Sequence, residues 1–349
     1  MIVSIIYFIL MLSIIVMVHE FGHFFFAKLF GIYVYEFSLG MGPKIWSKKD
    51  KKGETAYSIR AIPIGGFVQL AGEGMEDDKN LPKERLLQSK PVWQRFLVMF
   101  FGAGNNFILA LIVLFFMGLI AGVPDISNVV YDVVDGSPMQ QAGIMKGDEI
   151  IRINGNRIKT LDDLQLYLHI SKGETEFVVL RDGDKHTFKV TRLEEEEMNK
   201  RGYSFGIEYN QEREEGFGKS VVYAFEKFYS IIRQMALTLK ELFTGGVSVS
   251  ELSGPLGIYS AVDQTKETGI SNLIMLLALL SVNVGFMNLI PFPAFDGGRI
   301  LFLFIEKIKG SPVKAETENL IHSIGFFMLI ALIIFVTYND IVRLIKSIF

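Results

Sequence analysis

The chain has 349 residues, of which 35 are Lys or Arg and 38 are Asp or Glu, and half of its residues are apolar. The formal net charge of −3 argues against a nucleic-acid-binding protein, which normally concentrates basic residues on one surface. The mean hydropathy is +0.34 and long stretches carry no charge, so a wholly soluble protein is excluded. The absence of cysteine excludes disulfides, thiol catalysis and thiolate metal sites.

Four apolar stretches are each long enough to cross a bilayer, because about 20 helical residues span its hydrocarbon core. We predict membrane helices over about 2–28, 96–122, 270–290 and 320–338. The first is expected to be retained, since it has neither the basic start nor the small-residue cleavage site of a signal peptide. The predicted fold class is therefore an α-helical polytopic membrane protein with four transmembrane helices.

The loop between the first two helices, residues 31–94, contains ten Lys or Arg residues. The positive-inside rule places such a loop in the cytoplasm, and hence the next polar region outside. Within the loop, apolar Tyr57, Ile59 and Ala61 alternate with polar residues and are followed by Pro63 and two glycines. This pattern predicts a short strand and a turn.

The polar region between the second and third membrane helices is predicted to form a small β-rich domain outside the bilayer. It contains one clear helix, Leu161–Ile170, and an acidic run, Glu194–Glu197, that we expect to be a solvated face or loop. Strands are predicted at Val129–Val134, Glu149–Ile153, Phe177–Leu180 and Thr187–Thr191. Residues 217–243 mix aromatic, aliphatic and charged side chains, which predicts a surface or interfacial amphipathic helix.

These segments divide the chain into four predicted parts. They are an N-terminal membrane region (1–122), an extracytoplasmic domain (123–212), a connector with the amphipathic helix (213–269) and a C-terminal membrane region (270–349).

His19 and His23 lie four residues apart, so on a helix their imidazoles share one face and can reach one metal ion. Glu20, next to the first histidine, is placed to act as a general base on water. The alternative is a pair of helix histidines beside a snorkelling glutamate, but such side chains are costly at bilayer depth. His19 lies about 27 Å along the helix at about 1.5 Å per residue, which places it near the cytoplasmic side.

Zinc held by two histidines needs a third protein ligand and an open position. Asp296 follows Pro291 and Pro293, which interrupt the third membrane helix, and irregular backbone at membrane depth is tolerated where it is buried or lines a wet cavity. In the predicted topology Asp296 reaches the depth of His19, and the two glycines after it allow close backbone approach. A helix cap at the interface is the alternative role. Without thiolates the ligands are nitrogen and oxygen, which suits one zinc ion per chain.

Asn288 offers a donor and an acceptor to a substrate backbone, whose helix must unwind before it is cut. The strand near 57–68 could pair with such an extended substrate by β-addition. A helix-breaking structural amide is an equally good interpretation of Asn288. Asn105 and Asn106 are interpreted as contacts between helices rather than as catalytic groups. No role is assigned to the histidines without ligand spacing, which are His169, His186 and His322.

Taken together, these residues resemble the site-2 protease family of intramembrane zinc metalloproteases (M50), and within it the bacterial, RasP-like branch with a single PDZ domain. The resemblance covers nearly the whole chain and is carried by His19–Lys28, Gly31–Pro43, Ile62–Val68, Ser137–Gly155, Ser253–Ile258 and Asn288–Gly298. Two positions depart from the family pattern. Phe295 stands where Leu is usual, and Gly102-Ala103 precedes Asn106 where Gly-Pro is common.

The resemblance implies that His19, His23 and Asp296 bind zinc and that Glu20 is the catalytic base. It also implies a membrane-associated β-hairpin and an inserted α+β PDZ-like domain that filters substrates by size. Contact with the substrate is implied for a further set of residues, with Asn106 as an accessory: Asn288, Pro291, Pro293, Gly65, Gly66 and Phe67.

We therefore expect an enzyme of the bacterial cytoplasmic membrane that cuts the transmembrane segments of single-pass membrane proteins within the lipid bilayer, near the cytoplasmic side. Anti-sigma factors and remnant signal peptides are the expected substrates, and no nucleic acid is an expected partner. Two other functions compete. A non-catalytic PDZ membrane scaffold would need neither Glu20 nor Asp296, and a metal transporter should show further intramembrane carboxylates or histidines along a pathway.

Overall fold

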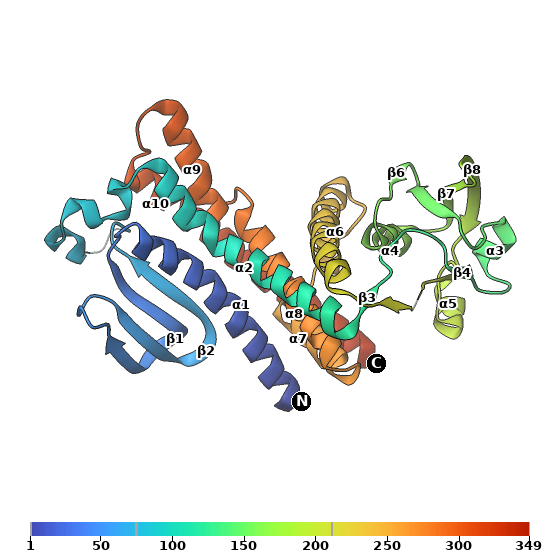
Figure 1. Cartoon of the computed structure of the whole chain (residues 1–349), viewed down its shortest axis with the longest axis horizontal. Helices are drawn as coiled ribbons and strands as arrows, with labels where there is room; N and C mark the ends of the chain where they lie inside the picture. The colour runs from blue at the N-terminus through green and yellow to red at the C-terminus, as the bar shows by residue number, and fades with distance from the viewer. Residues whose placement is uncertain (1, 74–75, 211, 349) are drawn as a thin grey trace. The chain divides into compact units, whose positions relative to one another are not determined.

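We describe a computed structural model of the chain for residues 2–73, 76–210 and 212–348 (Figure 1). The chain divides into two compact units, residues 1–113 with 252–349 and residues 114–251. The first unit contains α1 (Ile2–Leu29), β1 (Val34–Lys49), β2 (Ala56–Leu70), most of α2 (Val92–Ala121), α7 (Pro255–Glu267), α8 (Ile270–Leu289), α9 (Asp296–Lys309) and α10 (Ala315–Ile348).

The second unit is built from shorter elements, apart from its last helix. They are β3 (Val123–Pro124), β4 (Asp132–Val133), α3 (Pro138–Ala142), β5 (Glu149–Ile153), β6 (Asn156–Arg157), α4 (Leu161–Ile170), β7 (Glu174–Arg181), β8 (Asp184–Thr191), α5 (Glu195–Arg201), β9 (Ile207–Glu208), β10 (Arg213–Glu214) and α6 (Phe217–Thr244).

Among the described residues, four helices are long and apolar enough to cross a membrane, and they are α1, α2, α8 and α10. Each covers one of the predicted apolar stretches to within one residue, so the prediction of a mainly helical membrane protein is confirmed. The prediction for the last helix was too short, because α10 begins at Ala315 and ends at Ile348. The sequence analysis also did not predict the helices α7 and α9.

The β-hairpin of the first unit lies beside α1 (Figure 1). The first half of β1 has parts of β2 on both sides, since Phe37 pairs with both Tyr57 and Val68. Residues 66–70 therefore form an edge of this small sheet. The Ser13 hydroxyl of α1 donates a hydrogen bond to the carbonyl of Pro63 at 2.7 Å, which ties the hairpin to the helix. The predicted short strand is thus the first part of the longer strand β2, which continues through the residues predicted as a turn.

The segment between α8 and α9 carries Asp296 and is folded tightly. The prolines at 291 and 293 end α8, and α9 begins at Asp296 itself. A Cβ atom on Gly297 would overlap the carbonyl of Ile290, and one on Gly298 would overlap the carbonyl of Phe292. The predicted close backbone approach at these two glycines is therefore confirmed.

The core of the second unit lies between α4 and a four-stranded sheet with the order β6-β5-β7-β8. The predictions for α4 and β5 match the structure residue by residue, and the predicted strands at 177–180 and 187–191 lie within β7 and β8. The predicted strand Val129–Val134 was too long, because only Asp132 and Val133 pair with β9 and Val129 makes an isolated bridge.

Two short helices of this unit contradict the prediction of a single helix. In α3 the Ser137 side chain caps the helix by accepting a hydrogen bond from the Gln140 N–H, and Pro138 follows at the first helical position. The helix α5 begins at Glu195, so the acidic run is a helix rather than a loop, although its glutamates are exposed as expected.

The amphipathic helix predicted at 217–243 is present as α6 and packs on α4 (Figure 1). Lys227 pairs with the buried Asp162 at 2.8 Å, and Arg233 pairs with the fully buried Asp163 at 2.7 Å. These ion pairs attach the polar face of α6 to α4.

Candidate metal centre

The two histidines of α1 are directed toward each other. Because they lie four residues apart, they occupy one helix face, and both are buried. Their Nε2 atoms are 3.2 Å apart. Two imidazole nitrogens at this distance present their lone pairs to one small volume.

Asp296, at the start of α9, completes a triangle with these histidines. Its Oδ2 atom lies 3.2 Å from His19 Nε2 and 3.4 Å from His23 Nε2. This oxygen is buried and accepts no hydrogen bond from a described residue. A buried carboxylate oxygen is expected to have a partner, so a cation is the missing partner that this geometry indicates.

The triangle fits zinc. A tetrahedral ion bound at about 2.1 Å keeps its ligand atoms about 3.4 Å apart, which matches all three distances. Two imidazole nitrogens and one carboxylate oxygen are also a donor set that zinc accepts, and the fourth corner is left for water or substrate. Among the described residues, no second group of three His, Cys, Asp or Glu side chains converges in this way. A metal transporter would need further such groups along its pathway.

Outer contacts orient both imidazoles. His23 Nδ1 lies 2.8 Å from the carbonyl of Val98 in α2, so an Nδ1–H donor leaves Nε2 free to ligate. Asn106 of α2 is fully buried with its Nδ2 atom 3.5 Å from His19 Nδ1, and its Oδ1 atom accepts no bond from a described residue. If the amide is turned by 180°, Oδ1 takes the place of Nδ2 and can accept a hydrogen bond from His19 Nδ1–H. Asn105 donates to the carbonyl of Val18 at 3.3 Å, so both asparagines of α2 make the predicted contact with α1.

Glycines on the facing helices α1 and α2 allow close packing around the metal site. A Cβ atom on Gly22 would overlap the carbonyl of Phe101, so α1 and α2 touch through backbone. A Cβ atom on Gly102 would overlap the His23 ring and lie 3.0 Å from Asp296 Oδ2. This role of Gly102 was not predicted from the sequence. The signal was a small residue in a membrane helix, which is typical of close helix packing.

The base candidate Glu20 contacts the edge of the hairpin. The Val68 N–H donates to Glu20 Oε2 at 3.0 Å. A Cβ atom on Gly66 would lie 3.8 Å from Glu20 Cγ, so this glycine also lies next to the glutamate. Gly65 has a φ of +84°, which permits the bend before the edge segment, and Phe67 is covered by the guanidinium of Arg60.

The other predicted substrate-contacting residues lie on the segment that leads to Asp296. Asn288 donates a hydrogen bond to the carbonyl of Val284 at 3.0 Å within α8. Pro291 follows the end of α8, and Pro293 packs so closely on α10 that a Cβ atom on Gly325 would overlap it.

Comparisons with known proteins agree with this site. The model of peptidase family M50 matches residues 7–332. The chain belongs to this family. It is 38% identical over 341 residues to a putative zinc metalloprotease of Clostridium perfringens, with 97% of this chain and 98% of that protein covered. It is also similar to the zinc metalloproteases RasP of Oceanobacillus iheyensis (32% over 423 residues) and Bacillus licheniformis (34% over 420), each with 98% of this chain and 99% of the relative covered.

Membership in family M50 confirms the resemblance and the predicted enzyme class, an intramembrane zinc metalloprotease. The non-catalytic scaffold is therefore the wrong reading of this chain. The individual roles of the site residues stay predictions.

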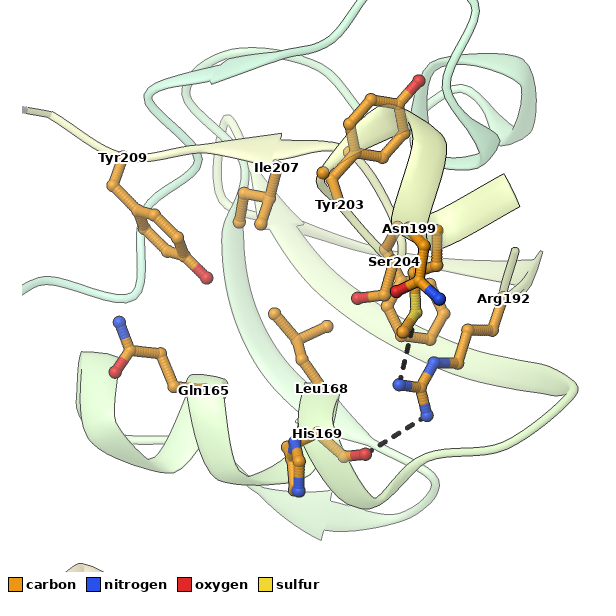
Figure 2. A pocket seen from close by; sticks show the side chains of 13 residues that line it. Gln165, Leu168, His169, Arg192, Asn199, Tyr203, Ser204, Ile207 and Tyr209 are labelled. Carbon is orange, nitrogen blue, oxygen red and sulfur yellow. Dashed lines mark hydrogen bonds between the residues drawn. The ribbon is translucent and has the colours of Figure 1, made fainter. Parts of the chain in front are cut away.

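The second unit contains a separate cavity of about 580 Å³ (Figure 2). It lies between α4 and the segment before β9, with apolar Leu168 and Ile207 and a polar rim that includes Gln165 and Tyr209. Arg192 also lines it and donates to the carbonyl of His169 at 3.2 Å (Figure 2). None of the lining residues belongs to the metal centre.

Proposed function

We propose that this M50 peptidase holds one zinc ion with His19, His23 and Asp296 and uses Glu20 as its general base. The observation that carries the proposal is the triangle of ligand atoms with edges of 3.2, 3.2 and 3.4 Å, one corner of which is a buried carboxylate oxygen that accepts no hydrogen bond from a described residue. When bound there, zinc supplies Lewis acidity, which polarises a carbonyl group and makes a water molecule more acidic.

Glu20 performs the proton transfers of the reaction. It accepts a proton from the attacking water as the water oxygen bonds to the carbonyl carbon of the scissile peptide. It then donates this proton to the amide nitrogen as the C–N bond breaks, so that the new amine leaves neutral. The hydrogen bond from the Val68 N–H holds one carboxylate oxygen and fixes the direction of the other.

The edge segment 66–70 is proposed to receive the substrate as an added strand. A membrane helix must release its backbone hydrogen bonds before water reaches a peptide bond, and an exposed sheet edge offers replacement partners. This edge lies beside Glu20, because Val68 contacts the carboxylate directly. Gly65, Gly66 and Phe67 would then contact the substrate backbone, while Asn288, Pro291 and Pro293 would shape the opposite wall.

The substrates are proposed to be single-pass proteins of the bacterial cytoplasmic membrane, including anti-sigma factors and remnant signal peptides. The region 123–212 is proposed to be a PDZ-like domain on the outer side that excludes substrates with bulky outer domains. The resemblance of Ser137–Gly155 to bacterial PDZ sequences supports this assignment, as does the separate hydrophobic core of the second unit.

Metal analysis tests the ligand set. Purified protein should carry about one zinc ion per chain, as expected for a mononuclear site. Asp296→Ala and His23→Ala should each lose it, whereas Asp263→Ala, which removes a half-exposed carboxylate of the first unit, should keep it. Full zinc occupancy in Asp296→Ala would remove this residue from the ligand set.

Two variants test whether the PDZ-like domain excludes substrates with bulky outer domains. Deletion of about 125–212, closed with a short linker, should permit cleavage of substrates with bulky outer domains and leave zinc content unchanged. Gln165→Trp, which fills the rim of the cavity in Figure 2, should leave cleavage of trimmed substrates unchanged if the domain acts by exclusion. Loss of cleavage of trimmed substrates in both variants would instead mean that the domain delivers the substrate.

A further inference from the structure

His322 of α10 contacts the segment that carries Asp296 without belonging to the metal triangle. Its Nδ1 atom accepts a hydrogen bond from the backbone N–H of Ala294 at 3.2 Å. Ala294 lies two residues before Asp296, at the end of the segment that follows α8. This contact therefore joins α10 to the backbone from which the third ligand projects.

Ala294 adopts an unusual backbone conformation. Its φ of +83° lies in the left-handed region, which is unfavourable for a residue with a Cβ atom. Among the described residues only two other non-glycine residues share this property, Asn154 and Asp182, and these residue types tolerate it. Alanine has no side-chain group to stabilise the conformation, so neighbouring structure must hold it.

The helix α10 supplies that support at two positions one turn apart. A Cβ atom on Gly325 would overlap the ring and carbonyl of Pro293, so the helix backbone touches the segment directly. The His322 ring is held beside Phe302, with ring centroids 5.6 Å apart, and only 18% of its side chain is exposed. The ring thus has little freedom to leave Ala294.

The tautomer of His322 follows from this contact. Since Nδ1 accepts the Ala294 N–H, the neutral ring carries its proton on Nε2. That atom lies 3.9 Å from Glu318 Oε1, which is too far for a hydrogen bond. The bond to Ala294 is therefore the hydrogen bond that orients this side chain among the described residues.

We propose that His322 is a positioning residue for the third metal ligand. By accepting the N–H of Ala294 it holds the left-handed turn, and this turn directs the Asp296 carboxylate toward His19 and His23. The proposal rests on the proposed function, in which Asp296 is a ligand. His322 itself touches neither metal nor substrate.

The test measures metal affinity rather than activity. Apo protein is titrated with Co²⁺, whose visible absorption reports the coordination geometry, in His322→Leu, His322→Asn and the control Asn319→Leu. Asparagine can place Oδ1 near the position of Nδ1, whereas leucine has no acceptor. Asn319 is an exposed residue one turn earlier on the same helix, and both residues line a cavity of about 670 Å³ in the first unit.

We expect His322→Leu to bind Co²⁺ about 10–100-fold more weakly, as is typical when an outer contact of a ligand is lost. Its absorption spectrum should change, while His322→Asn and Asn319→Leu should stay close to the wild type. Wild-type affinity and spectrum in His322→Leu would overturn the proposal. Equal losses in His322→Asn and His322→Leu would also overturn it, because the acceptor would then not be what matters.

A second variant covers the case in which His322→Leu fails to fold. Ala294→Gly removes the cost of the left-handed conformation, so His322→Leu in this background should fold and lose less affinity than in the wild-type background. An equal loss of affinity from His322→Leu in both backgrounds would contradict the proposed link between His322 and Ala294. Asp296→Ala distinguishes failure of the proposed ligand set from failure of the positioning role. If Asp296→Ala binds Co²⁺ normally, the proposed ligand set is wrong. If Asp296→Ala binds Co²⁺ poorly while His322→Leu binds it normally, only the positioning role is wrong.

Discussion

The backbone N–H of Val68 donates a hydrogen bond to Oε2 of Glu20 at 3.0 Å, which joins the edge of the β-hairpin to the base candidate on α1. The hairpin is thereby both the proposed surface for the substrate and a support for the glutamate. The edge segment 66–70, which would bind the substrate backbone, is thus hydrogen-bonded to Glu20, which would transfer the proton.

Val68→Pro removes this donor. We expect kcat/KM for a membrane substrate to fall by about 10–100-fold, because a hydrogen bond to a charged group contributes about 1.5–3 kcal/mol. Zinc content should be unchanged, since Val68 contacts none of the three ligands. Val68→Ala keeps the N–H and serves as the control, so equal rates for the two variants would contradict the role of the bond.

Asn106→Leu should weaken zinc binding. The amide is the polar group beside His19 Nδ1, and loss of such an outer contact typically costs about 10–100-fold in metal affinity. Asn105→Leu is the matched control, because this amide bonds to the Val18 carbonyl instead. Competition with a chelator measures both affinities. Equal affinities in the two variants would assign Asn106 to helix packing, as the sequence analysis had it.

Arg233→Ala should release α6 from α4. Asp163 is fully buried, and removal of one partner of a buried ion pair costs about 3–5 kcal/mol. Hydrogen exchange of the α6 amides in the intact protein measures this loss. Lys219→Ala, a change on α6 that breaks an exposed pair with Glu214 of β10, should change protection by less than about 1 kcal/mol. Similar protection in both variants would mean that the Arg233–Asp163 pair does not hold α6 on α4.

Acid should destabilise the second unit through Asp148. Burial alone would raise the pKa of this carboxyl, but hydrogen bonds from Arg181 and from the Met145 N–H hold the pKa below its ordinary value. Because the folded-state pKa is the lower one, the stabilisation is complete above the unfolded value of about 3.9 and is lost as the pH falls below it.

Hydrogen exchange of β5 and β7, corrected for the intrinsic effect of pH, provides the measurement. The wild type should lose opening free energy below about pH 4, the unfolded value of an aspartate. Asp148→Asn should be less stable at neutral pH and should show a shallower acid dependence. Parallel pH profiles for the two proteins would exclude Asp148 as the group responsible.

The sequence predicted the elements whose signal is local. Uninterrupted apolar runs marked the four long helices, and the spacing of His19 and His23 placed them on one face. The alternation at Tyr57–Ala61 found part of a strand, but its pairing with both halves of β1 depends on contacts far along the chain. The helix α9 was missed although it is as amphipathic as α6, because the prolines and glycines between residues 291 and 298 were interpreted only as an interruption of the third membrane helix.

Contacts made by backbone groups could not be predicted from the types of the residues that carry them. The carbonyl of Val98 orients His23 and the N–H of Val68 holds Glu20, and any residue but proline at 68 would offer the same N–H. His322 is different, because a titratable residue within a predicted membrane helix is itself a signal of function. Its partner is the strained Ala294, and this backbone conformation leaves no trace in the sequence.

Glu20→Gln provides the most direct test of the account. Wild type and variant are reconstituted in bilayers with a trimmed single-pass substrate, and cleavage and zinc content are measured on the same preparations. Glutamine keeps the volume of glutamate but cannot accept the proton, so we expect unchanged zinc content and cleavage slower by about 10²–10⁴-fold. Undiminished cleavage by Glu20→Gln, with zinc bound, would contradict the assignment of Glu20 as the base.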